Sequence, residues 1–127
     1  MIKKKIRREI IFYIIIGITS VVIDFLFFIF FTNIFYLNNS NSKRISYLIG
    51  SISSFLLNKR ITFKSPKKTF KEPILFSIVY LFSFVLNSFT HDLMLEYIDG
   101  SYPFIIATFI SVIINYIGQK FIVFKKK

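Results

Sequence analysis

Eight polar or charged side chains stand within or directly after long apolar runs, where a ligand-binding role is the first possibility to consider. They are one acid, four amides and three cations: Asp24, Asn58, Lys59, Arg60, Asn87, Asn115, Gln119 and Lys120. Arginine offers a bidentate fork and lysine a point charge, and both suit a phosphate or diphosphate headgroup. An acid or amide at membrane depth commonly marks a substrate pathway. The pattern therefore indicates binding of a charged, polar headgroup.

A packing role explains part of the same pattern. Asp24 and Asn87 lie about 20 Å along their apolar runs at helical rise, and they could hydrogen-bond to each other. Lys59, Arg60 and Lys120 come at the ends of apolar runs, where cations suit the helix dipole and reach the lipid headgroups. Glu9 is expected to balance Arg8. Both the structural and the functional interpretation stay open at this level.

The composition excludes several classes of protein. The chain has 127 residues, of which 54% are hydrophobic, and a soluble domain of this size cannot bury so much apolar surface. It has no cysteine, and His91 is its one histidine, so no zinc cluster is expected. We find no glycine-rich phosphate loop and no nucleophile–base pair. No cofactor, no metal and no enzymatic activity are predicted, and a proton relay at His91 and Asp92 is less favoured than a hydrated helix end.

Four apolar stretches supply the elements that must position these side chains, and we predict helices over about 10–31, 45–63, 74–98 and 103–124. The first is about 33 Å long at 1.5 Å per residue, enough for a hydrocarbon core of about 30 Å. The second stretch is a weaker candidate for a transmembrane helix, and it spans the membrane only if Lys59 and Arg60 extend to the lipid headgroups. A cleaved signal peptide is the competing interpretation of the first stretch, but no small-residue cleavage site follows it.

The distribution of charge predicts the orientation. Five basic residues precede the first stretch, six surround the middle loop and four end the chain, so fifteen of the seventeen lysines and arginines fall on one side. Lys43 and Arg44 fall on the other side. By the positive-inside rule both termini are cytoplasmic. The net charge of +11 therefore does not form a face for nucleic acid, and Lys64, Lys67, Lys68 and Lys71 are expected to contact anionic lipids.

The two halves of the chain resemble each other. In the first and third stretches, Gly17, Ser20 and Asp24 correspond to Tyr80, Ser83 and Asn87, each 63 positions later. In the second and fourth, four residues recur 61 positions later: Ser46, Gly50, Ser54 and Asn58 become Ala107, Ser111, Asn115 and Gln119. Four-residue spacing places each series on one helix face, where small residues allow helices to pack closely. We expect these faces to point inward.

Two segments resemble known signatures. Residues 54–63, SFLLNKRITF, and residues 115–124, NYIGQKFIVF, look like the repeated signatures of the GtrA-like family, and the segment 12–17 fits its start. The likeness spans nearly the whole chain. The family often has tryptophan where this chain has Ile61, and arginine where it has Lys120. The second departure removes one bidentate fork.

The resemblance implies a small multi-pass protein of the bacterial cytoplasmic membrane that acts in cell-surface polysaccharide, teichoic-acid or O-antigen glycosylation. Such proteins are thought to flip a polyprenyl-phosphate-linked sugar across the membrane. The matching signature positions are Asn58, Lys59, Arg60, Asn115, Gln119 and Lys120, while Asp24 and Asn87 come from the residue pattern alone. Related segments also serve as the membrane part of polyprenyl-phosphate sugar transferases.

The expected fold is all-α and integral to the membrane. It is a single domain over 1–127, a bundle of four transmembrane helices built as two parallel helical-hairpin repeats. Flipping of the lipid-linked sugar is the leading hypothesis. One alternative is a non-catalytic anchor or partner subunit of a membrane glycosyltransferase, and another is a small proton-coupled multidrug-type transporter that uses Asp24. Four short helices enclose little space, so a homo-oligomer is expected.

Overall fold

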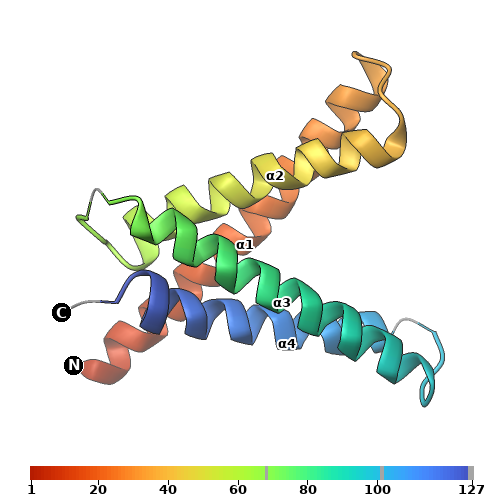
Figure 1. Cartoon of the computed structure of the whole chain (residues 1–127). Coiled ribbons are helices and arrows are strands. Elements are labelled where there is room, and N and C mark those ends of the chain that lie inside the picture. The colour runs from red at the N-terminus through yellow and green to blue at the C-terminus, as the bar shows by residue number, and fades with distance from the viewer. Residues whose placement is uncertain (68, 101, 126–127) are drawn as a thin grey trace. The chain divides into compact units, whose positions relative to one another are not determined.

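The computed structural model describes residues 1–67, 69–100 and 102–125, and the regular structure within these ranges is entirely helical (Figure 1). The chain divides into two compact units, Met1–Pro66 and Lys67–Lys127, and each unit is a helical hairpin. Three residues of the predicted basic side, Lys68, Lys126 and Lys127, lie outside the described residues.

Each hairpin consists of two α-helices, and its second helix continues into a five-residue π-helix, labelled η. The first hairpin contains α1 (Ile2–Asn33), α2 (Asn39–Leu57) and η1 (Asn58–Thr62). The second contains α3 (Lys71–Leu95), α4 (Tyr102–Gly118) and η2 (Gln119–Val123). α1 thus begins at Ile2 and not at Ile10, because the lysines and arginines before the apolar run are themselves good helix formers.

The turn between α1 and α2 is closed by two local devices. Tyr36 has a φ of 55°, and the Leu37 N–H donates to the Phe31 carbonyl oxygen at 3.1 Å, a helix ending that requires one left-handed residue. Asn38 then caps α2, because its Oδ1 accepts a hydrogen bond from the Asn41 N–H at 2.8 Å. The cap explains why α2 begins in a polar segment, ahead of the apolar run.

Small and polar residues form the contact face of each hairpin. A Cβ placed on Gly50 of α2 would lie 3.0 Å from the Ser20 carbonyl oxygen of α1, so the two backbones approach closely there. Buried polar residues lie on the same series in both units: Ser20, Ser46, Ser54 and Asn58 in the first, and Ser83 and Gln119 in the second. Large side chains point outward instead, and Phe25, Phe82 and Phe109 are each at least 58% exposed. Such an inside-out distribution suits a lipid environment.

Three helical segments are long and apolar enough to cross a membrane among the described residues: Ile2–Asn33, Lys71–Leu95 and Ile105–Val123. The apolar stretches of the sequence predict four crossings. α2 is not apolar enough to be counted with these three segments, because its first two turns carry asparagines, serines, Lys43 and Arg44. The chain is therefore an all-helical protein with three helices that fit a bilayer by length and composition.

Gly118 lies where α4 packs closely against α3, and it yields a prediction about stability. A Cβ at Gly118 would lie 2.5 Å from Cγ1 of Val79, a stiff β-branched side chain on α3. Gly118→Ala should therefore lower the free energy of unfolding in detergent by about 1–3 kcal/mol, as overpacking usually does. The measurement is thermal or denaturant unfolding followed by helical circular dichroism.

Gly17→Ala is the matched control, because a Cβ at Gly17 meets nothing within 4 Å. That change should leave the protein as stable or up to about 1 kcal/mol more stable, since alanine is the better helix former. Val79→Ala should also cost less in the Gly118→Ala background than in the wild type. Equal stability of the two glycine variants would contradict the close packing of α3 against Gly118.

Candidate functional site

The end of the first hairpin is organised by a buried polar ladder on α2 and η1. The Nδ2 of Asn58 donates to Ser54 Oγ at 3.2 Å, and Thr62 Oγ1 donates to Asn58 Oδ1 at 2.8 Å. All three side chains are buried. The Asn58 carbonyl oxygen accepts from the Phe63 N–H at 2.9 Å, the bond between residues i and i+5 that defines a π-helix. The amide of Asn58 thus fixes the shape of the helix end.

The cations of η1 lie away from this ladder. Arg60 is exposed and Lys59 is half-buried, whereas Asn58 and Thr62 on the same short helix are at most 2% exposed. After η1 the chain leaves the helix through Lys64, whose φ is 49°, and the Ser65 N–H donates to the Lys59 carbonyl oxygen at 2.9 Å. The ladder and this turn together present Arg60 at the surface of the hairpin end.

The second hairpin ends in the same way but holds its cation differently. Gln119 is completely buried, and its carbonyl oxygen accepts from the Phe124 N–H at 2.8 Å. Lys120 is half-buried, with its Nζ 3.3 Å from Tyr116 Oη and over the rings of Tyr116 and Phe121, 5.5 and 5.8 Å from their centroids. Aromatic rings therefore hold the Lys120 ammonium close to the helix.

A polar network joins α3 to α4 nearer the middle of the second hairpin. Asn87 Nδ2 donates to Ser111 Oγ at 2.9 Å, and Ser83 Oγ donates to the Ser111 carbonyl oxygen at 3.3 Å. One turn further along α4, Asn115 is half-buried, and its Oδ1 has no hydrogen-bond partner within the described part of the chain. Asn87 and Asn115 therefore give the interior of this hairpin a polar character.

Asp24 has a partner that the sequence analysis missed. Its Oδ2 lies 2.6 Å from Lys43 Nζ, and its Oδ1 accepts from Ser46 Oγ at 2.6 Å. The Asp24 side chain is 13% exposed and the Lys43 side chain 59%. A bond between Asp24 and Asn87 was the structural alternative considered above, yet each has its own partner inside its own hairpin. The antiparallel course of α1 and α2 is the feature that places Lys43 beside Asp24.

Two acids are buried, which the sequence pattern does not predict. Glu9 in α1 and Glu72 in α3 are 5% and 2% exposed, and Glu72 follows Glu9 by the same 63 positions that relate Asp24 to Asn87. Arg8 is exposed and lies over the Phe12 ring, 6.0 Å from its centroid, while Glu9 is turned inward. The spacing of 63 could have identified this pair in the sequence.

These side chains can bind and orient a ligand. Arg60, Lys59 and Lys120 are cations on the π-helices, and the buried amides Asn58 and Gln119 begin the same π-helices. No group of three potential metal ligands occurs in residues 1–67, 69–100 and 102–125. His91 Nδ1 lies 3.5 Å from Asp92 Oδ1 at an exposed position near the end of α3. The side chains at the helix ends are thus cations beside amides, the types of group that suit an anion.

Thr62 provides a test of the buried ladder. Thr62→Val keeps the shape of the side chain but leaves the buried Oδ1 of Asn58 without its donor, so the free energy of unfolding should fall by about 1–3 kcal/mol. The control is Thr19→Val, because Thr19 is exposed on α1 and its hydroxyl donates only to its own helix, to the Ile15 carbonyl oxygen at 2.9 Å. That change should stay within about 0.5 kcal/mol. Denaturant unfolding in detergent measures both, and an equal effect would argue against the ladder.

A comparison with known protein families gives a match over most of the chain. The sequence model of the GtrA/DPMS transmembrane domain matches residues 12–124, which cover α1 from Phe12 onward, the other three α-helices and both π-helices. No solved structure matches the chain. The match associates the chain with sugar translocation in membrane glycosylation, and with a family of generally non-catalytic membrane proteins. The chain belongs to the GtrA/DPMS transmembrane-domain family.

Proposed function

We propose that the protein flips a polyprenyl-phosphate-linked sugar across the bacterial cytoplasmic membrane, to supply glycosylation of a cell-surface polysaccharide, teichoic acid or O-antigen. The observation that carries the proposal is that a buried amide is followed directly by one or two cations on a π-helix at the end of each hairpin. Asn58 stands behind Lys59 and Arg60, and Gln119 stands behind Lys120. Family membership supports the same function.

The physical task of such a protein is limited to the headgroup. The prenyl chain is apolar and can stay in the lipid, while a phosphate and a sugar in hydrocarbon cost several kcal/mol for each unsatisfied polar group. A route therefore needs cations for the phosphate and hydrogen-bonding side chains for the sugar. It needs no nucleotide site if the lipid moves down its own gradient.

We assign different roles to the eight candidate residues. Arg60 is best placed to grip a phosphate, because it is exposed and carries the bidentate fork. Lys59 and Lys120 add point charges. Asn58 and Gln119 are buried and serve to position these cations, whereas Asn87, Asn115 and Asp24 give the hairpin interiors their polarity. None of these roles forms or breaks a covalent bond.

We further propose that the two hairpins are a parallel repeat and that α2 is a fourth crossing. Both hairpins end in a five-residue π-helix, and buried residues recur at the same spacings, with Glu9 and Glu72 63 apart and Asn58 and Gln119 61 apart. The charge of Lys43, which weakens α2 as a span, is compensated by Asp24 at 2.6 Å. With four crossings both termini lie in the cytoplasm, as the basic residues require.

The ion pair of Asp24 bears on the alternative functions. Its carboxylate accepts hydrogen bonds from Lys43 and Ser46, so both oxygens are engaged in holding α1 to α2, a packing role that the proton-coupled transporter does not require. The anchoring of a membrane glycosyltransferase remains compatible with the exposed basic residues, and anionic lipids suit the same residues. We propose a homo-oligomer as the transporting form, because four short helices enclose little space for a polar headgroup.

Transport can be tested with the purified chain in liposomes that contain a fluorescent polyprenyl-phosphate sugar. The wild type should equilibrate the label between leaflets, and Arg60→Ala should slow this by about tenfold or more, the usual effect of losing a charge-assisted contact. Arg7→Ala is the matched control, because it removes the same charge from an exposed position on α1. A wild-type chain that leaves the sidedness of the lipid unchanged would contradict transport and favour the anchor.

The four crossings can be tested with reporter fusions. Reporters after Lys5, Pro66 and Lys125 should all be cytoplasmic, and a reporter after Asp99 should be on the outer side, because each crossing reverses the chain. The measurement compares alkaline phosphatase with green fluorescent protein at each site. Opposite locations for Lys5 and Pro66 would show that α2 does not cross.

A further inference from the structure

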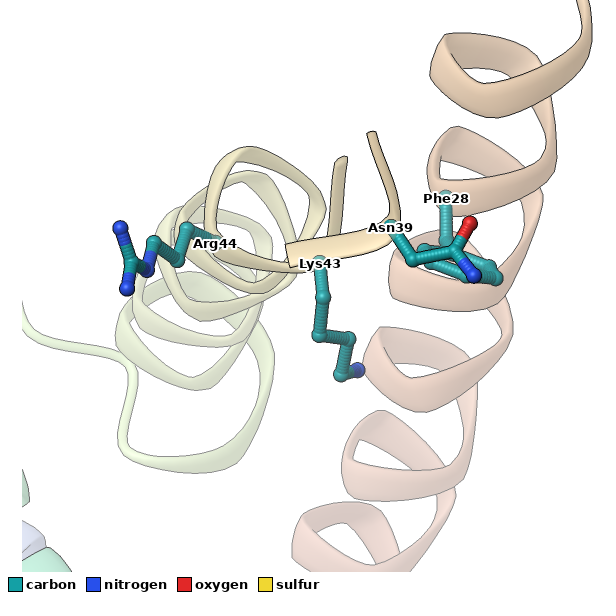
Figure 2. Close-up of a pocket in the computed structure, with 4 residues that line it drawn as sticks. All are labelled: Phe28, Asn39, Lys43 and Arg44. Atoms are coloured by element: carbon teal, nitrogen blue, oxygen red, sulfur yellow. The ribbon is translucent and has the colours of Figure 1, made fainter. Parts of the chain in front are cut away.

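An open hollow lies at the end of the first hairpin that is remote from η1. Its volume is about 500 Å³, and it is lined by Phe28 of α1 and by Asn39, Lys43 and Arg44 of α2 (Figure 2). Figure 2 shows Lys43 and Asn39 on the side of α2 that faces α1, with Asn39 beside Phe28 and Arg44 directed away. The hollow thus combines a cation, an amide and an apolar wall.

The charges around this hollow leave a surplus of one positive charge. Lys43 and Arg44 are cations, and Asp24 is the acid that lies against Lys43. Both Asp24 oxygens are already engaged, one by Lys43 and the other by Ser46 Oγ. Lys43 carries three N–H donors, and its side chain is 59% exposed, so its ammonium can bind an anion while it stays close to Asp24.

The need to neutralise the charge of Asp24 does not explain why two cations lie at this hollow. Ser46 already donates to Asp24, and one lysine would neutralise it, yet Arg44 adds a second cation at the next position. These are the two lysine or arginine residues that lie off the predicted basic side, where positive charge works against the orientation of the chain. A ligand in the hollow contacts Lys43 directly, and the neighbouring charge of Arg44 raises the positive potential around it.

We infer that this hollow is a second anion site, which binds the phosphate of an isoprenoid-linked ligand through Lys43 and Asn39, with the apolar part of the ligand against Phe28. The phosphate takes Lys43 as a shared partner, and Asp24 keeps its hydrogen bond from Ser46. Asp24 then competes with the ligand for Lys43 and limits the affinity of the site. The site could receive a lipid phosphate that has crossed the membrane, and this role rests on the proposed function. The affinity of the site for phosphate does not depend on that function.

The test measures binding of geranyl phosphate, a short isoprenoid phosphate, to the full chain in nanodiscs of uncharged phosphatidylcholine. Titration calorimetry should give a dissociation constant about tenfold higher for Lys43→Gln than for the wild type. Asp24→Asn should change the affinity in the opposite direction, because it removes the competing carboxylate. Lys43→Arg retains the charge and should retain binding.

Lys4→Gln is the matched control, because it removes the same charge from an exposed position near the other end of α1. Equal losses in Lys4→Gln and Lys43→Gln would overturn the site and leave only general attraction to a basic protein. Unchanged binding in Lys43→Gln would overturn it as well. The Lys43→Arg and Asp24→Asn variants keep the test valid if Lys43→Gln folds poorly.

Two further arms identify the source of the phosphate. Inorganic phosphate should bind more weakly than geranyl phosphate if Phe28 contacts the isoprenoid part, and equal binding would assign the site to free phosphate. Phosphatidylglycerol in the nanodisc should not displace geranyl phosphate, and full displacement would assign the site to bulk anionic lipid. A chain that binds through Lys43 but fails to move lipid would support this site and contradict the proposed function.

Discussion

A polar side chain inside a bilayer must find its hydrogen-bond partner within the protein, and this requirement determines which helix faces meet in each hairpin. Ser54, Asn58 and Thr62 satisfy one another along a single face. Asp24 is satisfied across the hairpin by Lys43 and Ser46. Large apolar side chains are consequently left for the lipid, and the small residues between the polar ones let the helices approach closely.

Much of the fold could be predicted from the sequence, because apolar runs and four-residue spacing are local signals. They indicated the helices and the inward faces that contain Ser54 and Asn58, and the signatures indicated the family that the comparison confirms. The π-helices could not be predicted, because the bond from the Phe63 N–H to the Asn58 carbonyl oxygen depends on side chains already packed around it. The start of α2 depends on one capping residue, Asn38, ahead of the apolar run.

The candidate site was harder to predict than the fold. A sequence shows that Asn58 and Arg60 are near one another, but only the structure shows that the first is buried and the second exposed. Lys43 resembled a loop residue, because its acid partner lies on another helix. Glu9 and Glu72 are separated by 63 positions, the same spacing that relates Asp24 to Asn87, but this spacing alone does not show that both acids are buried. In each case the missing information was the direction of a side chain across the hairpin.

The length of α1 has a mechanical consequence. Its 32 residues extend about 48 Å, well beyond a hydrocarbon core of about 30 Å. Such an excess is accommodated by tilting or by projecting a helix end into the headgroup layer. A thin bilayer would therefore incline α1 more steeply than a thick one. Because α2 is packed along α1, the depth of both ends of the first hairpin would change together with bilayer thickness, and lipid acyl length becomes a variable that sets where its charged groups meet water.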